Sequence, residues 1–165
     1  MPEPVSEGTV ARDPFRLIAQ AQADYARCID DDRLEAWPDF FSESCVYKIT
    51  TAENVREGLE AGIIFANSRD MLRDRVSALR EANIYERQSY RHILGQPCIL
   101  SDDGAEVRSE TSFLVMRTVQ DGDSVIYATG RYLDLYAIGD DTTKLVERIV
   151  VCDSSRINTL LAIPL

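Results

Sequence analysis

The sequence is poor in the residues that metal, redox and nucleotide chemistry need. Its 165 residues include one histidine, His92. A mononuclear iron site of the two-histidine, one-carboxylate kind needs two histidines, and a Rieske cluster needs two histidines and two cysteines. This chain alone can build neither. The sequence also lacks a phosphate loop, a G-x-G-x-x-G turn and a G-x-S-x-G elbow.

The four cysteines form no metal-binding or redox motif. No two of them approach a C-x-x-C spacing, which excludes a zinc ribbon and a thioredoxin-type site. Cys45 and Cys98 lie in apolar runs. We therefore expect both to be buried, reduced thiols.

Positive charge is scarce as well. Lys and Arg number 18 against 28 Asp and Glu, so the net charge is −10. Such a chain repels phosphate backbones and anionic lipid, and we expect no nucleic-acid partner and no membrane partner. The apolar runs are too short to span a bilayer, and the first 12 residues lack the apolar segment of a secretory signal. These features predict a cytoplasmic protein.

The chain has the length and composition of one domain. Hydrophobic residues make up 45% of it, which is enough for a core. Residues 1–12 contain two prolines and a glycine and are predicted to be a disordered arm before a single domain at 13–165. Asp13 and Pro14 indicate the start of a helix that runs to about Asp30.

The remaining pattern predicts further helices followed by long strands. Asp32 can cap a short second helix, and Ser68 caps a third. From Tyr90 onward, alternating apolar residues separated by turn sequences predict antiparallel strands, with a bend or bulge at Gly130. Helices first and strands later indicate an α+β fold. Strands of about 10 to 15 residues curve strongly, and such a sheet wrapped around the N-terminal helices gives a cone.

His92 is the first candidate for chemistry, because a histidine beside a carboxylate can act as a general base. We favour the alternative that His92 makes only packing or interface hydrogen bonds, since one histidine specifies no reaction. Tyr90 and Arg91 precede it, and these residue types are common at protein interfaces. The candidate carboxylate partners are Asp24, Asp30, Asp31 and Asp134, and the candidate carbonyl-polarising groups are Tyr25, Tyr47 and Tyr132.

Charged residues in the strand region are further candidates. Alternation along a strand places Arg131 and Asp134 on opposite faces, and Arg148 and Asp153 likewise. They can pair across strands or meet a partner chain, and the sequence leaves both open. Residues 159–165 are apolar, so we expect this tail to dock on its own sheet or on a neighbouring subunit. The predicted subunit contacts are Tyr90, Arg91, His92, Arg131, Arg148 and Leu165.

The next features are stretches in order along the chain: DRLEAWPDFF at 32–41, CVY at 45–47, REANIYER at 80–87, YRHILGQP at 90–97, GRYLD at 130–134, ERIVVCDS at 147–154 and AIPL at 162–165. Together they resemble the small (beta) subunits of bacterial aromatic-ring-hydroxylating dioxygenases. The similarity begins at about residue 15 and continues to residue 165. Residues 58–64 and the Asn-Ile-Tyr-Glu-Arg segment most resemble the terephthalate dioxygenase branch.

The resemblance implies a cystatin-like α+β cone, with the N-terminal helices packed on a curved, mainly antiparallel sheet. It also implies a beta subunit with no cofactor of its own. The partner alpha subunit would hold the Rieske [2Fe-2S] cluster and the mononuclear Fe(II). A reductase would pass electrons from NAD(P)H to that subunit, the aromatic ring would become a cis-dihydrodiol, and three alpha would assemble with three beta subunits.

Two hypotheses of different classes follow. In the first, the chain is a non-catalytic structural subunit of a dioxygenase for an aromatic carboxylate, with terephthalate first and anthranilate or salicylate next. In the second, it is a stand-alone dehydratase, cyclase or isomerase that uses a His92–carboxylate pair inside the cone.

Overall fold

Four helical segments and seven strands make up the computed structural model, which describes residues 12–82, 88–156 and 163–165. The predicted arm at 1–12 lies outside the described residues except for Arg12, which donates a hydrogen bond to the carbonyl of Gly104 at 2.7 Å. The helical segments are α1 (Pro14–Asp30), η1 (Leu34–Phe40), α2 (Ala52–Arg56) and α3 (Arg69–Glu81). The strands are β1 (Phe41–Thr51), β2 (Ile64–Ala66), β3 (Ser89–Leu94), β4 (Cys98–Asp102), β5 (Glu106–Thr118), β6 (Ser124–Ile138) and β7 (Thr143–Cys152).

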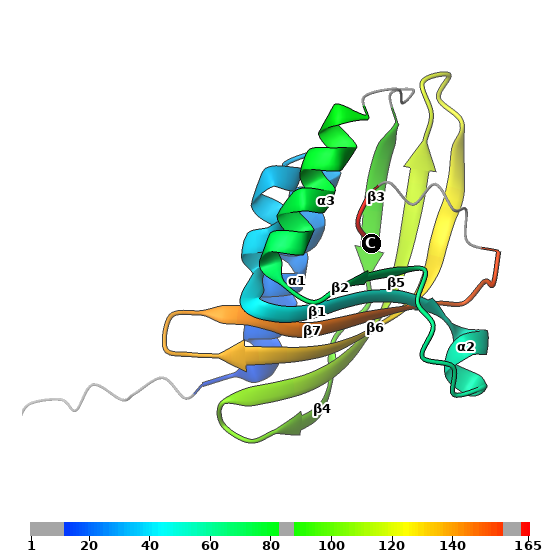
Figure 1. The fold of residues 1–165 in the computed structure, drawn as a ribbon. Coiled ribbons are helices and arrows are strands. Elements are labelled where there is room, and N and C mark those ends of the chain that lie inside the picture. The colour runs from blue at the N-terminus through cyan, green and yellow to red at the C-terminus, as the bar shows by residue number, and fades with distance from the viewer. Residues whose placement is uncertain (1–11, 83–87, 157–162) are drawn as a thin grey trace, which may run out of the picture.

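The strands form one curved sheet in the order β2-β1-β7-β6-β5-β3, with β4 also paired to β5. All pairings are antiparallel except that of β1 with β7, which is parallel. The long strands β5 and β6 bend along their length, and α1, η1 and α3 lie against the hollow that this curvature creates (Figure 1). The predicted α+β cone is confirmed.

Local sequence sets where two of the helices begin. The side chain of Asp13 accepts a hydrogen bond from the Arg16 amide, with Pro14 in the first turn of α1. The side chain of Ser68 accepts one from the Met71 amide at the start of α3. These contacts satisfy amides that have no partner within the helix. Both predicted helix starts are confirmed.

The predicted cap of the second helix is wrong. Asp32 adopts a left-handed backbone conformation with φ of 57°, and η1 follows Arg33 without a side-chain cap. The carboxylate of Asp32 instead accepts a hydrogen bond from Arg80 at 2.8 Å. Arg80 also binds Glu35 through Nε at 2.7 Å, so this arginine fastens α3 to η1. The hydrogen bond from Arg80 holds the pKa of Glu35 at about 2.

The sequence predicts a bend or bulge at Gly130, and the bulge in the pairing of β6 with β5 lies at Tyr127 instead. The register with β5 shifts between Val115, which is opposite Ala128, and Met116, which is opposite Ile126. Gly130 serves close packing instead. A Cβ atom at this position would lie 2.0 Å from the carbonyl oxygen of Val151. Only glycine lets β6 and β7 approach this closely.

The core lies between the sheet and the helices α1, η1 and α3. Cys45 is buried as predicted, but Cys98 is exposed, because β4 pairs with β5 alone and leaves its other edge open. None of the helices in the described part of the chain is long and apolar enough to cross a membrane. The largest side chains with almost no exposed surface are Trp37, Arg148, Tyr25, Tyr47, Tyr132, Tyr136 and Phe41.

Candidate functional site

His92 and Asp30 form a buried pair that joins the end of α1 to β3. The Nδ1 atom of His92 lies 2.6 Å from one carboxylate oxygen of Asp30, and the main-chain amide of His92 donates to the other at 2.9 Å. Their side chains are 0% and 4% exposed. Because a carboxylate only accepts hydrogen bonds, Nδ1 is the donor in this contact. Among the described residues, Nε2 has no hydrogen-bond partner.

Of the four candidate carboxylates, the structure therefore brings Asp30 to His92. Asp24 accepts a hydrogen bond from Gln20 at 3.1 Å on α1, and Asp134 binds Arg148. The His92–Asp30 contact ties two elements of the fold together. His92 thus makes a packing hydrogen bond, and the same contact is the histidine–carboxylate pair that the second hypothesis requires.

The two residues before His92 take different positions. Tyr90 is half-buried, its ring centroid lies 5.3 Å from that of Tyr127, and its hydroxyl donates to Gln88 at 2.9 Å. Burial raises the pKa of both tyrosines, that of Tyr127 to about 12. Arg91 is exposed on β3 opposite Met116. Of these neighbouring positions, Arg91 is the one available to a partner chain.

Arg131 also lies where a partner could reach it. Its guanidinium is 3.5 Å from Glu110 on the neighbouring strand, and the two side chains are 43% and 38% exposed. Asp134 is buried on the opposite face of β6, which confirms the predicted alternation. Because this ion pair is half-exposed, Arg131 can leave Glu110 for an acidic side chain on another subunit at little cost in free energy.

Arg148 lies entirely inside the cone. Its Nε and Nη2 atoms donate to the two oxygens of Asp134 at 2.8 and 2.7 Å, and Nη2 also reaches the hydroxyl of Tyr136 at 3.3 Å. Its Cζ atom lies 4.2 Å from the ring centroid of Tyr25 and 3.9 Å from that of Tyr132. Burial opposes the charged form, but Asp134, Tyr136 and Tyr25 together outweigh it, and the pKa of Arg148 lies well above its usual value. The described contacts of this predicted interface residue are all internal.

Polar side chains from α1 and β5 complete the network around Asp134. Gln22 donates to Asp134 at 3.2 Å and to Thr111 at 2.9 Å, and Thr111 donates back to Gln22 at 3.2 Å. This role of Gln22 is not among the predictions from the sequence, although Gln22 occupies an inward position between Ile18 and Tyr25 on α1, which is the pattern that could have indicated it.

Leu165 is buried in the same interior. Its main-chain oxygen accepts hydrogen bonds from the hydroxyls of Tyr25 at 2.8 Å and Tyr47 at 3.3 Å, and its amide donates to Tyr47 at 3.1 Å. In Figure 1 the mark for this end of the chain overlaps β3. The described part of the predicted tail, Ile163–Leu165, thus docks on its own chain, and residues 159–162 lie outside the described residues. Tyr25 and Tyr47 bind main chain here, where the sequence suggested carbonyl polarisation.

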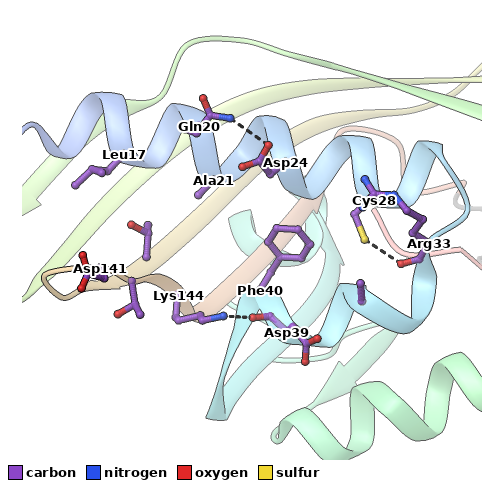
Figure 2. Close-up of a pocket in the computed structure, with 13 residues that line it drawn as sticks. Leu17, Gln20, Ala21, Asp24, Cys28, Arg33, Asp39, Phe40, Asp141 and Lys144 are labelled. Carbon is purple, nitrogen blue, oxygen red and sulfur yellow. Dashed lines mark hydrogen bonds between the residues drawn. The ribbon is translucent and has the colours of Figure 1, made fainter.

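A groove of about 470 Å³ lies on another side of α1, against η1 and the turn between β6 and β7 (Figure 2). The Sγ of Cys28 donates to the carbonyl of Arg33 at 3.0 Å, and Lys144 donates to the carbonyl of Asp39. None of the predicted contact residues lines this groove. From α1 the groove is lined by Leu17, Gln20, Ala21, Asp24 and Cys28, and Cys28 also belongs to the core.

The residues that the structure describes do not fit an iron centre. Its one histidine is bonded to Asp30, and the described residues contain no group of three or more His, Cys, Asp or Glu that could hold a metal ion. The interior is instead occupied by an ion pair, aromatic rings and Leu165.

A curved sheet closed by N-terminal helices defines the cystatin-like class of α+β cones. The chain belongs to the ring hydroxylating beta subunit family, which matches residues 24–159.

Individual relatives agree with this assignment. The chain is 50% identical over 148 residues to the terminal oxygenase component subunit beta 1 of terephthalate 1,2-dioxygenase from Comamonas sp, covering 90% of this chain and 96% of the relative. It is 39% identical over 148 residues to the anthranilate 1,2-dioxygenase small subunit from Burkholderia cepacia, covering 90% and 92%. A crystal structure described as the beta subunit of an aromatic-ring-hydroxylating dioxygenase from Novosphingobium aromaticivorans matches with a TM-score of 0.85 and 40% identity, covering 92% and 96%.

Proposed function

We propose that this chain is the non-catalytic beta subunit of a cytoplasmic dioxygenase that cis-dihydroxylates terephthalate. We infer terephthalate as the substrate from the 50% identity to a terephthalate dioxygenase beta subunit over 90% of the chain. Anthranilate is the second candidate substrate because of the 39% identity to an anthranilate dioxygenase subunit. In the overall reaction, the ring gains both atoms of O₂ and two hydrogens, and NAD(P)H and a proton supply the electrons and hydrogens.

The proposed partner is an alpha subunit that holds a Rieske [2Fe-2S] cluster and a mononuclear Fe(II), with three alpha and three beta subunits in the particle. A reductase component delivers electrons to the alpha subunit. The metal-ligating residues of this chain support the placement of both iron sites in the alpha subunit, because its single histidine is bonded to Asp30. The chemistry belongs to the partner, and this chain contributes shape and contact surface.

The six predicted contact residues divide into two groups in this proposal. Arg91 and Arg131 reach the surface and meet a neighbouring subunit directly. The other four act indirectly, because their contacts within the chain hold the strands that carry Arg91 and Arg131 in place. These four are Tyr90, His92, Arg148 and Leu165. Charged or aromatic anchors surrounded by apolar area are typical of subunit interfaces.

The experiment is co-purification with the large subunit. A tagged chain is isolated from its host grown on an aromatic acid, and the mass, iron, acid-labile sulfide and visible spectrum of the particle are recorded. A brown complex with a larger partner, and reductase-dependent NAD(P)H oxidation that is faster with terephthalate than with anthranilate, supports the proposal. Faster oxidation with anthranilate would move the substrate to the second candidate.

Surface variants test the contact residues. Charge reversal at Arg131 or Arg91 is expected to reduce the yield of complex, whereas reversal of the exposed Arg16 on α1 leaves it unchanged. A colourless, iron-free homo-oligomer that turns over a small hydroxy or carbonyl substrate would contradict the proposal in favour of the stand-alone enzyme. Loss of turnover in His92→Gln particles of normal mass and iron content would do the same.

A further inference from the structure

One side of the sheet has no covering layer where β3, β5 and β6 run side by side. The helices α1, η1 and α3 lie on the hollow side, so in the described part of the chain no helix covers the other side of these three strands (Figure 1). His92 and Val115 point to the hollow side and are buried, so their neighbours along each strand point to the open side. We call this open part of the three strands the outer face. It consists of Arg91, Ile93, Leu114, Met116, Ile126 and Arg131.

Strand register places apolar side chains next to one another on the outer face. Ile93 is opposite Leu114, and Met116 is opposite Ile126. Ile93 is 52% exposed and Ile126 is 65% exposed, whereas Leu114 and Met116 are partly buried. The solvated face of an antiparallel sheet normally carries polar side chains. Apolar side chains that adjoin across three strands are therefore typical of a surface that another protein covers.

The outer face also carries an arginine without a counter-charge, although the chain as a whole has a net charge of −10. Arg91 is exposed and has no acidic partner in the described part of the chain. The carboxylates nearest to it by register are already bonded, Glu110 to Arg131 and Asp153 to Thr129. A surface that complements this face presents apolar side chains and a carboxylate for Arg91.

These features distinguish a different protein from a second copy of this chain. A second copy that docked by the same face would offer Arg91 only carboxylates that already have partners, and it would add another unpaired Arg91. A surface of different sequence can supply a free carboxylate and cover both isoleucines at once. Arginine beside apolar side chains is a common arrangement at the centre of such contacts.

We propose that the outer face docks an apolar surface of the alpha subunit that presents a carboxylate to Arg91. Ile93 and Ile126 are the most exposed apolar contacts, and Leu114 and Met116 lie on the strand between them. This inference rests on the proposed function. It adds which side of the cone faces the alpha subunit and which apolar residues that subunit covers.

Matched surface substitutions test the apolar contacts in the particle that co-purifies with the tagged chain. Ile93→Glu and Ile126→Glu alter exposed side chains, so both variants should fold. We expect each to bind the large subunit at least about ten-fold more weakly, because docking would bury a carboxylate without a partner. Leu100→Glu alters a leucine that is 58% exposed on β4, outside the outer face, and should bind as the unaltered chain does. Unchanged affinity in both isoleucine variants would overturn the proposal.

Ionic strength tests the carboxylate opposite Arg91. We expect Arg91→Gln to weaken the complex and to reduce the dependence of its affinity on salt, because one charge pair is lost. Arg16→Gln on α1 is the control and should change neither quantity. The same salt dependence in Arg91→Gln and in the unaltered chain would overturn the pairing of Arg91 with a carboxylate.

Hydrogen exchange provides a measurement that needs no substitution. In the particle, peptides from residues 89–94 and 124–131 should exchange several-fold more slowly than in the chain alone, whereas residues 98–102 on β4 should not change. Slower exchange confined to other segments would place the alpha subunit elsewhere and overturn the proposal.

The outcomes also separate this inference from the proposed function. If no large subunit co-purifies with the unaltered chain, the proposed function fails and the inference fails with it. If the particle forms and the isoleucine variants form it equally well, only the docking surface is wrong. If Ile126→Glu instead dissociates an oligomer of this chain alone in sedimentation experiments, the outer face binds a second copy and the proposal is overturned.

Discussion

Asp134 and Arg148 lie directly opposite each other on adjacent strands, β6 and β7, and form a bidentate ion pair inside the cone. The two side chains are 0% and 1% exposed. A buried pair of this kind gives little net stability compared with an apolar pair, but the loss of one partner leaves an uncompensated charge.

The first prediction follows from that asymmetry. Asp134→Asn keeps the shape of the side chain and removes its charge, so Arg148 is left buried without a counter-ion. We expect the free energy of unfolding in urea to fall by about 3 to 5 kcal/mol. Glu110→Gln alters the half-exposed pair with Arg131 and is the matched control, with an expected loss below about 1 kcal/mol. Equal losses in the two variants would contradict the assignment of Asp134 as the required counter-ion.

The second prediction concerns the contact between α1 and β3. Asp30→Asn weakens two hydrogen bonds to His92 that now end on a charged acceptor. Charge-assisted bonds in the interior are worth about 1.5 to 3 kcal/mol each, so we expect a loss of about 2 kcal/mol in the same assay. Asp24→Asn on the same helix removes a single contact with Gln20 and should cost less than about 0.5 kcal/mol. If Asp30→Asn costs no more than Asp24→Asn, the pair does not hold the two elements together.

The third prediction uses the close approach of β6 and β7. Gly130→Ala places a Cβ atom against the carbonyl oxygen of Val151, and a backbone atom cannot move aside without breaking the pairing of the strands. Overpacking of this kind costs about 1 to 3 kcal/mol, and we expect the upper part of that range. Gly95→Ala is the control, because its nearest neighbour is 3.4 Å away. A thermal melt of both variants distinguishes them, and a normal Tm for Gly130→Ala would refute the close contact.

The fourth prediction is a loss of stability at alkaline pH. Burial raises the pKa of Tyr47 and Tyr132 well above 10, and the pKa values of Tyr25 and Tyr136 are raised for the same reason. The unfolded chain ionises its tyrosines at about 10, so it releases protons that the folded chain retains. The stabilising effect is complete below that pH and is lost as the pH rises above it.

Ultraviolet absorbance of the phenolate checks this prediction. We expect the four buried tyrosines to ionise together with the loss of circular dichroism, after the more exposed groups. Independent ionisation of all tyrosines near pH 10 in the folded protein would contradict it.

The sequence predicts the parts of this fold that local interactions decide. The caps at Asp13 and Ser68 fix helix starts through contacts with residues three positions away. Strand alternation correctly places Asp134 and Arg131 on opposite faces of β6.

Long-range pairing decides the rest. The parallel contact of β1 with β7 has no local signature, and neither has the choice of Asp134 as the partner of Arg148. The same holds for the candidate site. The sequence predicts Arg148 and Leu165 as contact residues, but it does not indicate that both side chains point inward. The residues that surround them come from segments far away in the sequence.

The pairing of β1 with β7 also has a kinetic consequence. β1 is completed early in synthesis, yet its parallel partner is the seventh strand, and Tyr47 bonds to a residue 118 positions further along. Contacts between such distant segments require large loops to close and slow the folding of a domain. During synthesis on the ribosome, β1 and the hydrophobic face of α1 stay unpaired until the later strands, β7 among them, have emerged. Nascent chains of this protein are therefore expected to depend on chaperones more than a local helical bundle of the same length would.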